Sequence, residues 1–172
     1  MTERERRERF DDLYASYDRR VLAYCLYVTS DRDLAHDVFQ EVFVKAYQAL
    51  HTLRDSGKEA NWLFRIARNE CLNALKSRQR TERRTVALDF VPEPAGPGDG
   101  VTNRDAHEYL RRAIDQLPPD YREALVLAEF EGFSLKEIAE ITGASLSNVK
   151  VRIHRAKQKL HTMLEPILND YE

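Results

Sequence analysis

Several features that mark common protein classes are scarce or absent in this sequence. Cysteine occurs only as Cys25 and Cys71, at positions that fit no metal-ligand spacing. Both fall in apolar helical patterns, so we expect buried thiols, with a redox pair as the alternative. No apolar run is long enough to cross a membrane, and no signal-type apolar core follows the charged N-terminus. The sequence therefore predicts a cytoplasmic protein that does not insert into membranes.

Patterns typical of catalysis are also missing. The sequence has no Gly-rich phosphate loop, no His/Cys/carboxylate set with metal-ligand spacing and no nucleophile–base pattern. Its five histidines are scattered, and a lone histidine is more often a surface or packing residue. We therefore expect no enzymatic activity, no metal and no cofactor. The net charge of −2 at pH 7 gives no general attraction to nucleic acid, so any such site must be local.

Strand patterns are almost absent, and apolar residues recur at helical spacing through the N-terminal half. A helical stripe runs from Phe10 to Val28, and Thr29-Ser30-Asp31 breaks it and caps a second helix over residues 34–50. Residues 51–60 favour a loop, and a third helix is expected over Asn61–Gln79. Three such helices can bury one another as a compact bundle.

The helical pattern stops at a segment rich in proline and glycine. Residues 91–100 read Val-Pro-Glu-Pro-Ala-Gly-Pro-Gly-Asp-Gly, which excludes a helix or a central strand. We expect a flexible linker over residues 81–104. It separates an N-terminal helical domain, residues 1–80, from a C-terminal one, residues 105–172. The predicted fold class is therefore all-α, with two small helical domains joined by a flexible Pro/Gly linker.

Start and stop signals in the C-terminal domain predict a helix-turn-helix. Ser134 and Glu137 have the spacing of a capping box, which starts a short helix. Gly143 supplies the left-handed backbone that ends this helix, and Ser145 can cap the longer helix that follows. A short helix, a glycine turn and a longer helix in this order are typical of a DNA-binding motif.

The longer helix of this motif combines one apolar stripe with many cations. Val149, Ile153, Ala156 and Leu160 recur at steps of 4, 3 and 4, which places them on one buried face. Lysines, arginines and a histidine cover the rest of the helix, and residues 141–164 contain no Asp or Glu. Such a helix suits the major groove of DNA. The alternative is a solvated helix in an all-α bundle.

The second helix carries a polar stripe that the bundle itself does not need. Asp37, Gln40 and Glu41 lie on the side opposite the apolar residues, with Val44 among them. A single exposed valine is common on protein surfaces. A protein contact and an ordinary solvated face are therefore both open on this stripe alone.

The third helix interleaves aromatic and cationic side chains near its start. Trp62 and Phe64 are followed by Arg65 and Arg68, and Glu70 is the only acid in residues 61–80. Rings on which bases stack, next to cations that pair with phosphates, suit single-stranded nucleic acid. The alternative is that both aromatic residues belong to the core and that the cations are solvated.

These motifs together resemble a known family. Residues 37–50, Asp-Val-Phe-Gln-Glu-Val-Phe-Val-Lys-Ala-Tyr-Gln-Ala-Leu, are similar to the helix with which bacterial sigma factors dock on RNA polymerase. Residues 61–69, Asn-Trp-Leu-Phe-Arg-Ile-Ala-Arg-Asn, resemble the promoter-melting helix that follows it. Residues 117–125, Leu-Pro-Pro-Asp-Tyr-Arg-Glu-Ala-Leu, and the helix-turn-helix after them look like the domain that reads the −35 element. With only a short linker between domains, the chain resembles the extracytoplasmic-function (ECF) group over about residues 8–165.

The resemblance and the residue patterns together imply roles for particular residues. The predicted polymerase-docking surface comprises Asp37, Gln40, Glu41 and Val44. The predicted −10 contacts are Lys45, Leu53, Arg54, Asp55, Ser56, Gly57, Lys58, Trp62, Arg65 and Asn69. The predicted −35 contacts are Ser145, Lys150, Val151, Arg152, His154, Arg155 and Lys159, with Arg152 directed toward phosphate. Both reading surfaces vary within the family, so the preferred bases stay open.

The resemblance implies a dissociable sigma factor that binds core RNA polymerase and promoter DNA, duplex at −35 and single-stranded at −10. An anti-sigma factor that covers both faces is the expected inhibitor, and the free chain is expected to be a monomer. The alternative is a dimeric helix-turn-helix regulator, with residues 1–80 as a sensing or dimerising bundle. Purified protein separates the two, because only the regulator would shift duplex DNA without polymerase.

Overall fold

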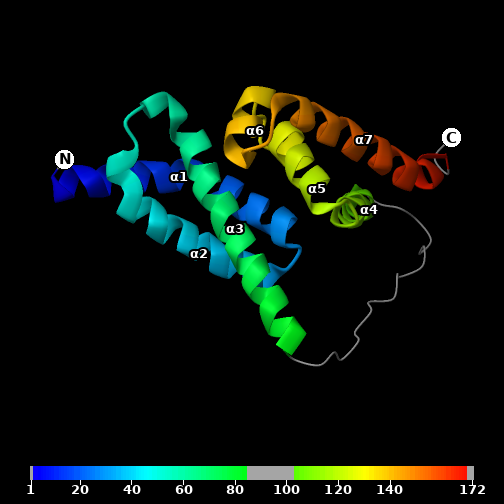
Figure 1. Cartoon of the computed structure of the whole chain (residues 1–172), viewed down its shortest axis with the longest axis horizontal. Coiled ribbons are helices and arrows are strands. Elements are labelled where there is room, and N and C mark those ends of the chain that lie inside the picture. The colour runs from blue at the N-terminus through cyan, green and yellow to red at the C-terminus, as the bar shows by residue number, and fades with distance from the viewer. Residues whose placement is uncertain (1, 85–102, 170–172) are drawn as a thin grey trace.

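The computed structural model describes residues 2–84 and 103–169 (Figure 1). Within these ranges every regular element is helical, which confirms the predicted all-α class. The N-terminal unit contains α1 (Glu3–Thr29), α2 (Arg32–Ala49), the short 3-10 turns η1 (Leu50–Thr52) and η2 (Ser56–Lys58), and α3 (Glu59–Arg84). The C-terminal unit contains α4 (Asn103–Asp115), α5 (Pro119–Leu125), the π-helical turn η3 (Val126–Phe130), α6 (Leu135–Thr142) and α7 (Leu146–Asn169).

The first helix begins earlier than its apolar stripe indicates. Thr2 and Glu5 form a capping box, in which each side chain accepts a hydrogen bond from the other residue's backbone N–H. The guanidinium of Arg6 donates to the carbonyl of Tyr47 at 2.7 Å and lies over its ring, 4.4 Å from the centroid. These polar contacts hold the first turns of α1 against α2, ahead of the apolar stripe that begins at Phe10.

The junction between α1 and α2 follows the sequence prediction. Ser30 adopts the left-handed conformation, with φ 51°, and its backbone N–H bonds to the carbonyl of Leu26. Asp31 then caps α2, because its carboxylate accepts from the backbone N–H of Leu34 at 2.8 Å. This bond is also the main reason that the pKa of Asp31 lies below its ordinary value.

The third helix extends beyond the predicted Asn61–Gln79 at both ends. Its last turns are held by Arg78, which forms ion pairs of 2.8 Å with Asp31 and Glu82. Because α4 begins at Asn103, helical structure also enters the C-terminal end of the predicted linker. The remaining linker residues, 85–102, lie outside the described residues.

The helix-turn-helix forms as predicted. Ser134 and Glu137 make both hydrogen bonds of a capping box, at 3.2 and 2.8 Å. Gly143 has φ 72° and returns its N–H to the carbonyl of Ala139, which ends α6. On α7, Val149 and Ala156 are buried, as the apolar stripe predicts.

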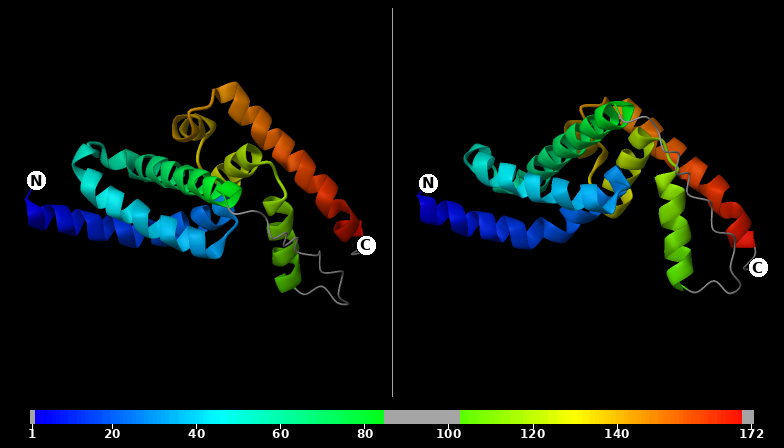
Figure 2. Two further views of the ribbon diagram at one scale, coloured as in Figure 1. Left: turned by 60° about the horizontal axis from the view of Figure 1, so that its bottom comes forward. Right: turned by 90° about the horizontal axis from the view of Figure 1, so that it is seen from below.

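The two units share one hydrophobic core, which the sequence analysis did not anticipate. Phe64 of α3 packs edge-on against Phe133, with ring centroids 5.0 Å apart. Buried residues of α5, η3 and α6 join those of α1 and α3 in a single apolar cluster. Figures 1 and 2 show α5 and α6 lying against this side of the N-terminal bundle. Cys25 and Cys71 are buried in that bundle, as predicted, and the pKa of Cys71 is raised by its contact with the Cys25 thiol and by burial.

Candidate protein and nucleic-acid interfaces

The outer face of α2 is open to solvent and has few contacts of its own. Asp37, Gln40, Glu41 and Val44 are all exposed, and Val44 retains 50% of its accessible surface. Across the described residues, the side chains of Asp37 and Gln40 have no hydrogen-bond or ion-pair partner. The opposite side of the helix is buried in the core, so this face is free to meet another molecule.

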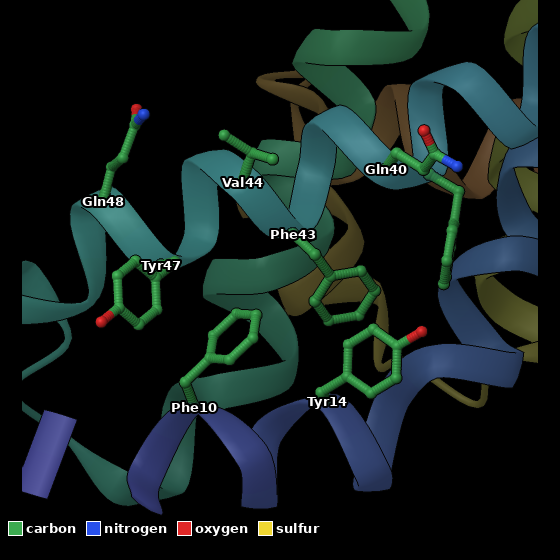
Figure 3. A pocket seen from close by; sticks show the side chains of 8 residues that line it. Phe10, Tyr14, Gln40, Phe43, Val44, Tyr47 and Gln48 are labelled. Atoms are coloured by element: carbon green, nitrogen blue, oxygen red, sulfur yellow. The ribbon is translucent and has the colours of Figure 1, made fainter. Parts of the chain in front are cut away.

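An aromatic groove lies beside this face. Figure 3 shows Phe10 and Tyr14 of α1 turned toward Phe43 of α2, below Val44. The rings of Tyr14 and Phe43 are 4.7 Å apart between centroids. The groove has a volume of about 450 Å³ and reaches Gln40 of the polar stripe and Gln48, which also lies on α2. Sequence reasoning missed it because helical periodicity assigns these aromatic residues to the core without showing that the core is open there.

The structure brings two predicted −10 residues together on neighbouring helices. Lys45 of α2 and Asn69 of α3 line one hollow of about 420 Å³, with His51, Ile66 and Glu70. The ammonium of Lys45 lies 2.7 Å from the Glu70 carboxylate, which is nearly buried. This hydrogen bond raises the pKa of Lys45 and so favours its protonated, positively charged form. Sequence spacing alone did not identify Glu70 as its partner.

The segment that joins α2 to α3 is more ordered than the predicted loop. The Trp62 indole N–H donates to the Thr52 hydroxyl at 3.2 Å, and the Asp55 carboxylate accepts from the Gly57 N–H at 2.9 Å. Arg54, Lys58 and Arg65 are exposed, whereas the Ser56 side chain lies outside the described residues.

Two side chains in this region are placed in the core. Leu53, predicted as a −10 contact, is only 5% exposed, so in this structure its side chain anchors the segment rather than facing solvent. Phe64 is completely buried, which bears out the core alternative for that ring. Trp62 is half-buried and keeps an accessible surface.

The outward face of α7 carries the predicted −35 residues. Lys150, His154 and Lys159 are exposed and have no hydrogen-bond or ion-pair partner in the described parts of the chain. Val151 is 43% exposed among these cations. Ser145 acts as the cap of α7, because its hydroxyl accepts from the backbone N–H of Asn148 at 3.2 Å.

Two arginines of α7 are held by the start of α5. Arg155 donates to the hydroxyl of Tyr121 at 3.1 Å, and Arg152 lies 3.1 Å from the carboxylate of Asp120. Arg152 is the less exposed of the two arginines. To contact a DNA phosphate, its guanidinium would have to leave the Asp120 carboxylate. Sequence reasoning missed both partners, because a contact between two helices leaves no signal in local spacing.

Family models match both the N-terminal and the C-terminal unit of the chain. The model described as Sigma-70 region 2 matches residues 13–81, and the model described as Sigma-70, region 4 matches residues 107–160. The first match covers α2 and most of α1 and α3, and the second covers the helix-turn-helix. None of the helices in the described ranges is long and apolar enough to span a membrane.

Relatives match along nearly the whole chain. RNA polymerase sigma-H factor of Pseudomonas aeruginosa is 33% identical over 94% of this chain and 89% of its own length. ECF RNA polymerase sigma factor SigM of Bacillus subtilis is 31% identical over 93% of this chain and 98% of its own. The ECF sigma-E factor of Escherichia coli is 30% identical, over 92% and 88%.

Solved structures share the fold. The sigma factor RpoE in complex with the anti-sigma factor NepR, from Bartonella quintana, superposes with a TM-score of 0.79 at 24% identity, over 92% of this chain and 98% of that one. CnrH in complex with the cytosolic domain of CnrY gives 0.65 at 23% identity, over 93% and 90%. The findings favour the predicted sigma factor over the dimeric regulator. The chain belongs to the ECF RNA polymerase sigma factors.

Proposed function

We propose that this sigma factor docks on core RNA polymerase through the outer face of α2 and reads promoter DNA through two separate surfaces. The observation that carries the proposal is the contrast between two open helical faces. The face of α2 offers carboxylates, amides and an aromatic groove, whereas the face of α7 offers cations without nearby acids on the same helix. This difference in charge supports protein docking at the first face and DNA binding at the second.

Polymerase docking rests on Asp37, Gln40, Glu41 and Val44. An exposed valine beside an aromatic groove gives apolar area to bury, and the surrounding polar groups give direction. Asp37 and Gln40 have no partner in the described residues, so binding breaks no contact that the fold needs.

Reading of the −35 element rests on α7. Lys150 and Arg155 carry donors suited to guanine edges, and Val151 offers apolar contact to a thymine methyl group. Lys159 and Arg152 lie on the same helix and can neutralise phosphates, which orients the helix in the groove. His154 adds a further hydrogen-bonding group on the exposed face.

Reading of the −10 element rests on the hollow between α2 and α3 and on the segment beside it. Asn69 has both donor and acceptor groups, as recognition of a base edge requires. Trp62 keeps an accessible ring surface for stacking, and Arg54, Lys58 and Arg65 supply charge for phosphates. Lys45 also lines this hollow and is held there by its ion pair with Glu70.

We infer that the chain acts beside the chromosome in the cytoplasm and has no catalytic group of its own. An anti-sigma factor is the proposed inhibitor, because RpoE, one of the two structural neighbours named above, was solved in complex with a protein described as an anti-sigma factor. Its binding would have to cover the α2 face, the α7 face or both. The proposed free form is a monomer.

Run-off transcription with added core polymerase, on promoters varied at each element, tests this assignment. We expect exchange of residues 53–58 for the segment of another ECF sigma factor to change the preferred −10 base and to leave −35 preference unchanged. Arg155→Ala should instead change the preferred −35 bases and leave −10 preference unchanged. If the exchanged protein keeps its original −10 preference, the reader lies elsewhere on α3.

A further inference from the structure

Two cations of α7 are paired with carboxylates that come from the segment before the helix-turn-helix. The guanidinium of Arg152 lies 3.1 Å from the carboxylate of Asp120 in α5. The ammonium of Lys157 forms an ion pair with the carboxylate of Glu129 in η3. Residues 141–164 contain no acid of their own. Both carboxylates are therefore brought to α7 by the packing of the C-terminal unit.

The two paired cations lie on opposite sides of α7. At 3.6 residues per turn, Arg152 and Lys157 fall about 70° to either side of the buried apolar stripe. A helix with its side chains is about 10–12 Å across and fills a major groove about 12 Å wide, so its flanks face the two phosphate backbones. With the outward side of α7 in the groove, Arg152 and Lys157 would each face a backbone.

The acid partner of Arg152 is held in place by the fold. Asp120 lies in the first turn of α5, which packs against α7 (Figure 1). This part of α5 is anchored by Arg122, which is buried and donates to the carbonyls of Ile114 and Leu117 at 3.1 and 3.0 Å. The pair between Arg152 and Asp120 is therefore determined by packed helices rather than by two freely moving side chains.

Both carboxylates are nevertheless open to solvent. The side chains of Asp120 and Glu129 retain 62% and 48% of their accessible surface. Exposed ion pairs contribute little to protein stability, because water and salt screen them. A DNA phosphate is also an anion that accepts charge-assisted hydrogen bonds, so it can replace such a carboxylate. Loss of the ion pair then makes DNA binding weaker than it would be with an unpaired cation.

The proposed base reader on α7 has a different kind of partner. Arg155 donates to the hydroxyl of Tyr121, which carries no charge at neutral pH. A neutral acceptor can orient a guanidinium without cancelling its positive charge. The carboxylates thus meet the cations on the flanks of α7, whereas the cation proposed to read a base edge meets a hydroxyl.

We propose that Asp120 and Glu129 occupy, in the free chain, the positions that DNA phosphates take on α7 in the promoter complex. The proposal rests on the proposed function, because it requires α7 to lie in the major groove, and it adds Lys157 to the residues that contact DNA. Phosphates carry no sequence information, so the competition lowers the affinity for DNA of every sequence. It keeps the free chain from binding DNA at random and makes promoter binding depend on the further contacts that polymerase supplies.

DNA binding by the full chain without polymerase tests the proposal. Fluorescence anisotropy with two labelled duplexes of unrelated sequence, at low and at physiological salt, measures the affinities. Asp120→Asn and Glu129→Gln remove the two charges and retain the size of the side chains. The matched control is Glu165→Gln, which removes the same charge from an exposed residue of α7 that has no partner among the described residues. Circular dichroism melting verifies that all variants are folded.

We expect each of the two substitutions to tighten binding to both duplexes about two- to fivefold at low salt, which is the range for loss of an exposed ion pair. The double variant should gain about four- to 25-fold, since the two sites are independent. Higher salt should reduce these gains because it screens the charges. The control should gain much less. In an Arg152→Ala background, Asp120→Asn should gain no more than the control, because the cation that it would release is absent.

Unchanged DNA affinity of the double variant would overturn the proposal. An equal gain in Glu165→Gln would also overturn it, because the effect would then be one of overall charge. A full gain from Asp120→Asn in the Arg152→Ala background would do the same. Absence of promoter-dependent transcripts from the original chain with core polymerase is a separate result, which contradicts the proposed function itself.

Discussion

The outer faces of α2 and α7 belong to helices that pack in the same way but carry opposite charge. Each helix buries one apolar stripe and leaves its other side in water. On α2 the exposed side carries two carboxylates, an amide and Val44 beside an aromatic groove. On α7 it carries lysines, arginines and a histidine, and the nearest acids come from α5 and η3 rather than from α7 itself.

Because the two helices differ only on their exposed sides, the residues that stabilise the fold are distinct from those proposed to recognise partners. The buried stripes determine where each helix packs, and the exposed residues can differ in charge without changing the fold. Substitutions on either outer face should therefore alter binding strongly and unfolding weakly. They should also act on different partners, polymerase for α2 and DNA for α7.

The largest expected effect concerns the α2 face. Gln40→Ala combined with Glu41→Lys removes an amide and reverses a charge at the proposed docking surface. We expect association with core polymerase to be abolished and the free energy of unfolding to change by no more than about 1 kcal/mol, as is usual for exposed positions. A pull-down measures the first quantity and thermal unfolding the second. Recovery of polymerase by a folded double mutant would count against this face.

The next effect concerns base reading by α7. Arg155→Ala and Lys150→Ala should each cost about 1–3 kcal/mol in binding if the side chain contacts a base edge, and should relax preference at one or two base pairs. Arg152→Ala should instead weaken binding to all sequences and lower the salt dependence. Selections from randomised −35 DNA measure both. If base preference is unchanged in both Arg155→Ala and Lys150→Ala, neither side chain reads a base edge of the −35 element.

A smaller effect is expected at Tyr121, which holds the Arg155 guanidinium through one hydrogen bond. Tyr121→Phe keeps the ring and removes the hydroxyl, so −35 affinity should fall by about 0.5–1.5 kcal/mol. The same change should have no effect in the Arg155→Ala background. A full effect in that background would show that Tyr121 acts by another route.

The smallest effect on binding is expected at Ser145, where a cap and a DNA contact predict different outcomes. Ser145→Ala removes the cap of α7 and should cost about 1 kcal/mol of stability. Ser145→Asn retains a capping oxygen and should therefore keep the stability of the original chain. If Ser145→Asn is as stable as the original but binds −35 DNA much less well, Ser145 contacts DNA as well as capping the helix.

The sequence predicted the local features of this protein better than the contacts between its parts. Asp31, the Ser134 capping box and Gly143 marked helix ends correctly because each acts on backbone groups a few residues away. The start of α1 was missed although Thr2 and Glu5 also form a capping box, because the prediction followed the apolar stripe instead.

Contacts between distant residues had no comparable signal. Nothing in the spacing of Glu123 or Glu131 indicates that their partners lie on α1 and α3. In the same way Leu53 was grouped with exposed loop residues, although its side chain is buried. Lys45 and Asn69, both among the predicted −10 contacts, do line one hollow, because the short connection between α2 and α3 lets these adjacent helices pack antiparallel.

Promoter recognition by this chain as a subunit of RNA polymerase can be tested in one experiment that measures DNA binding and transcription together. Purified chain is mixed with duplex promoter DNA, with and without core polymerase, and specific complexes and run-off transcripts are measured together. We expect specific complexes and defined transcripts only when both proteins are present. A specific, dimeric complex of the chain alone with duplex DNA, unchanged by polymerase and without transcripts, would contradict it.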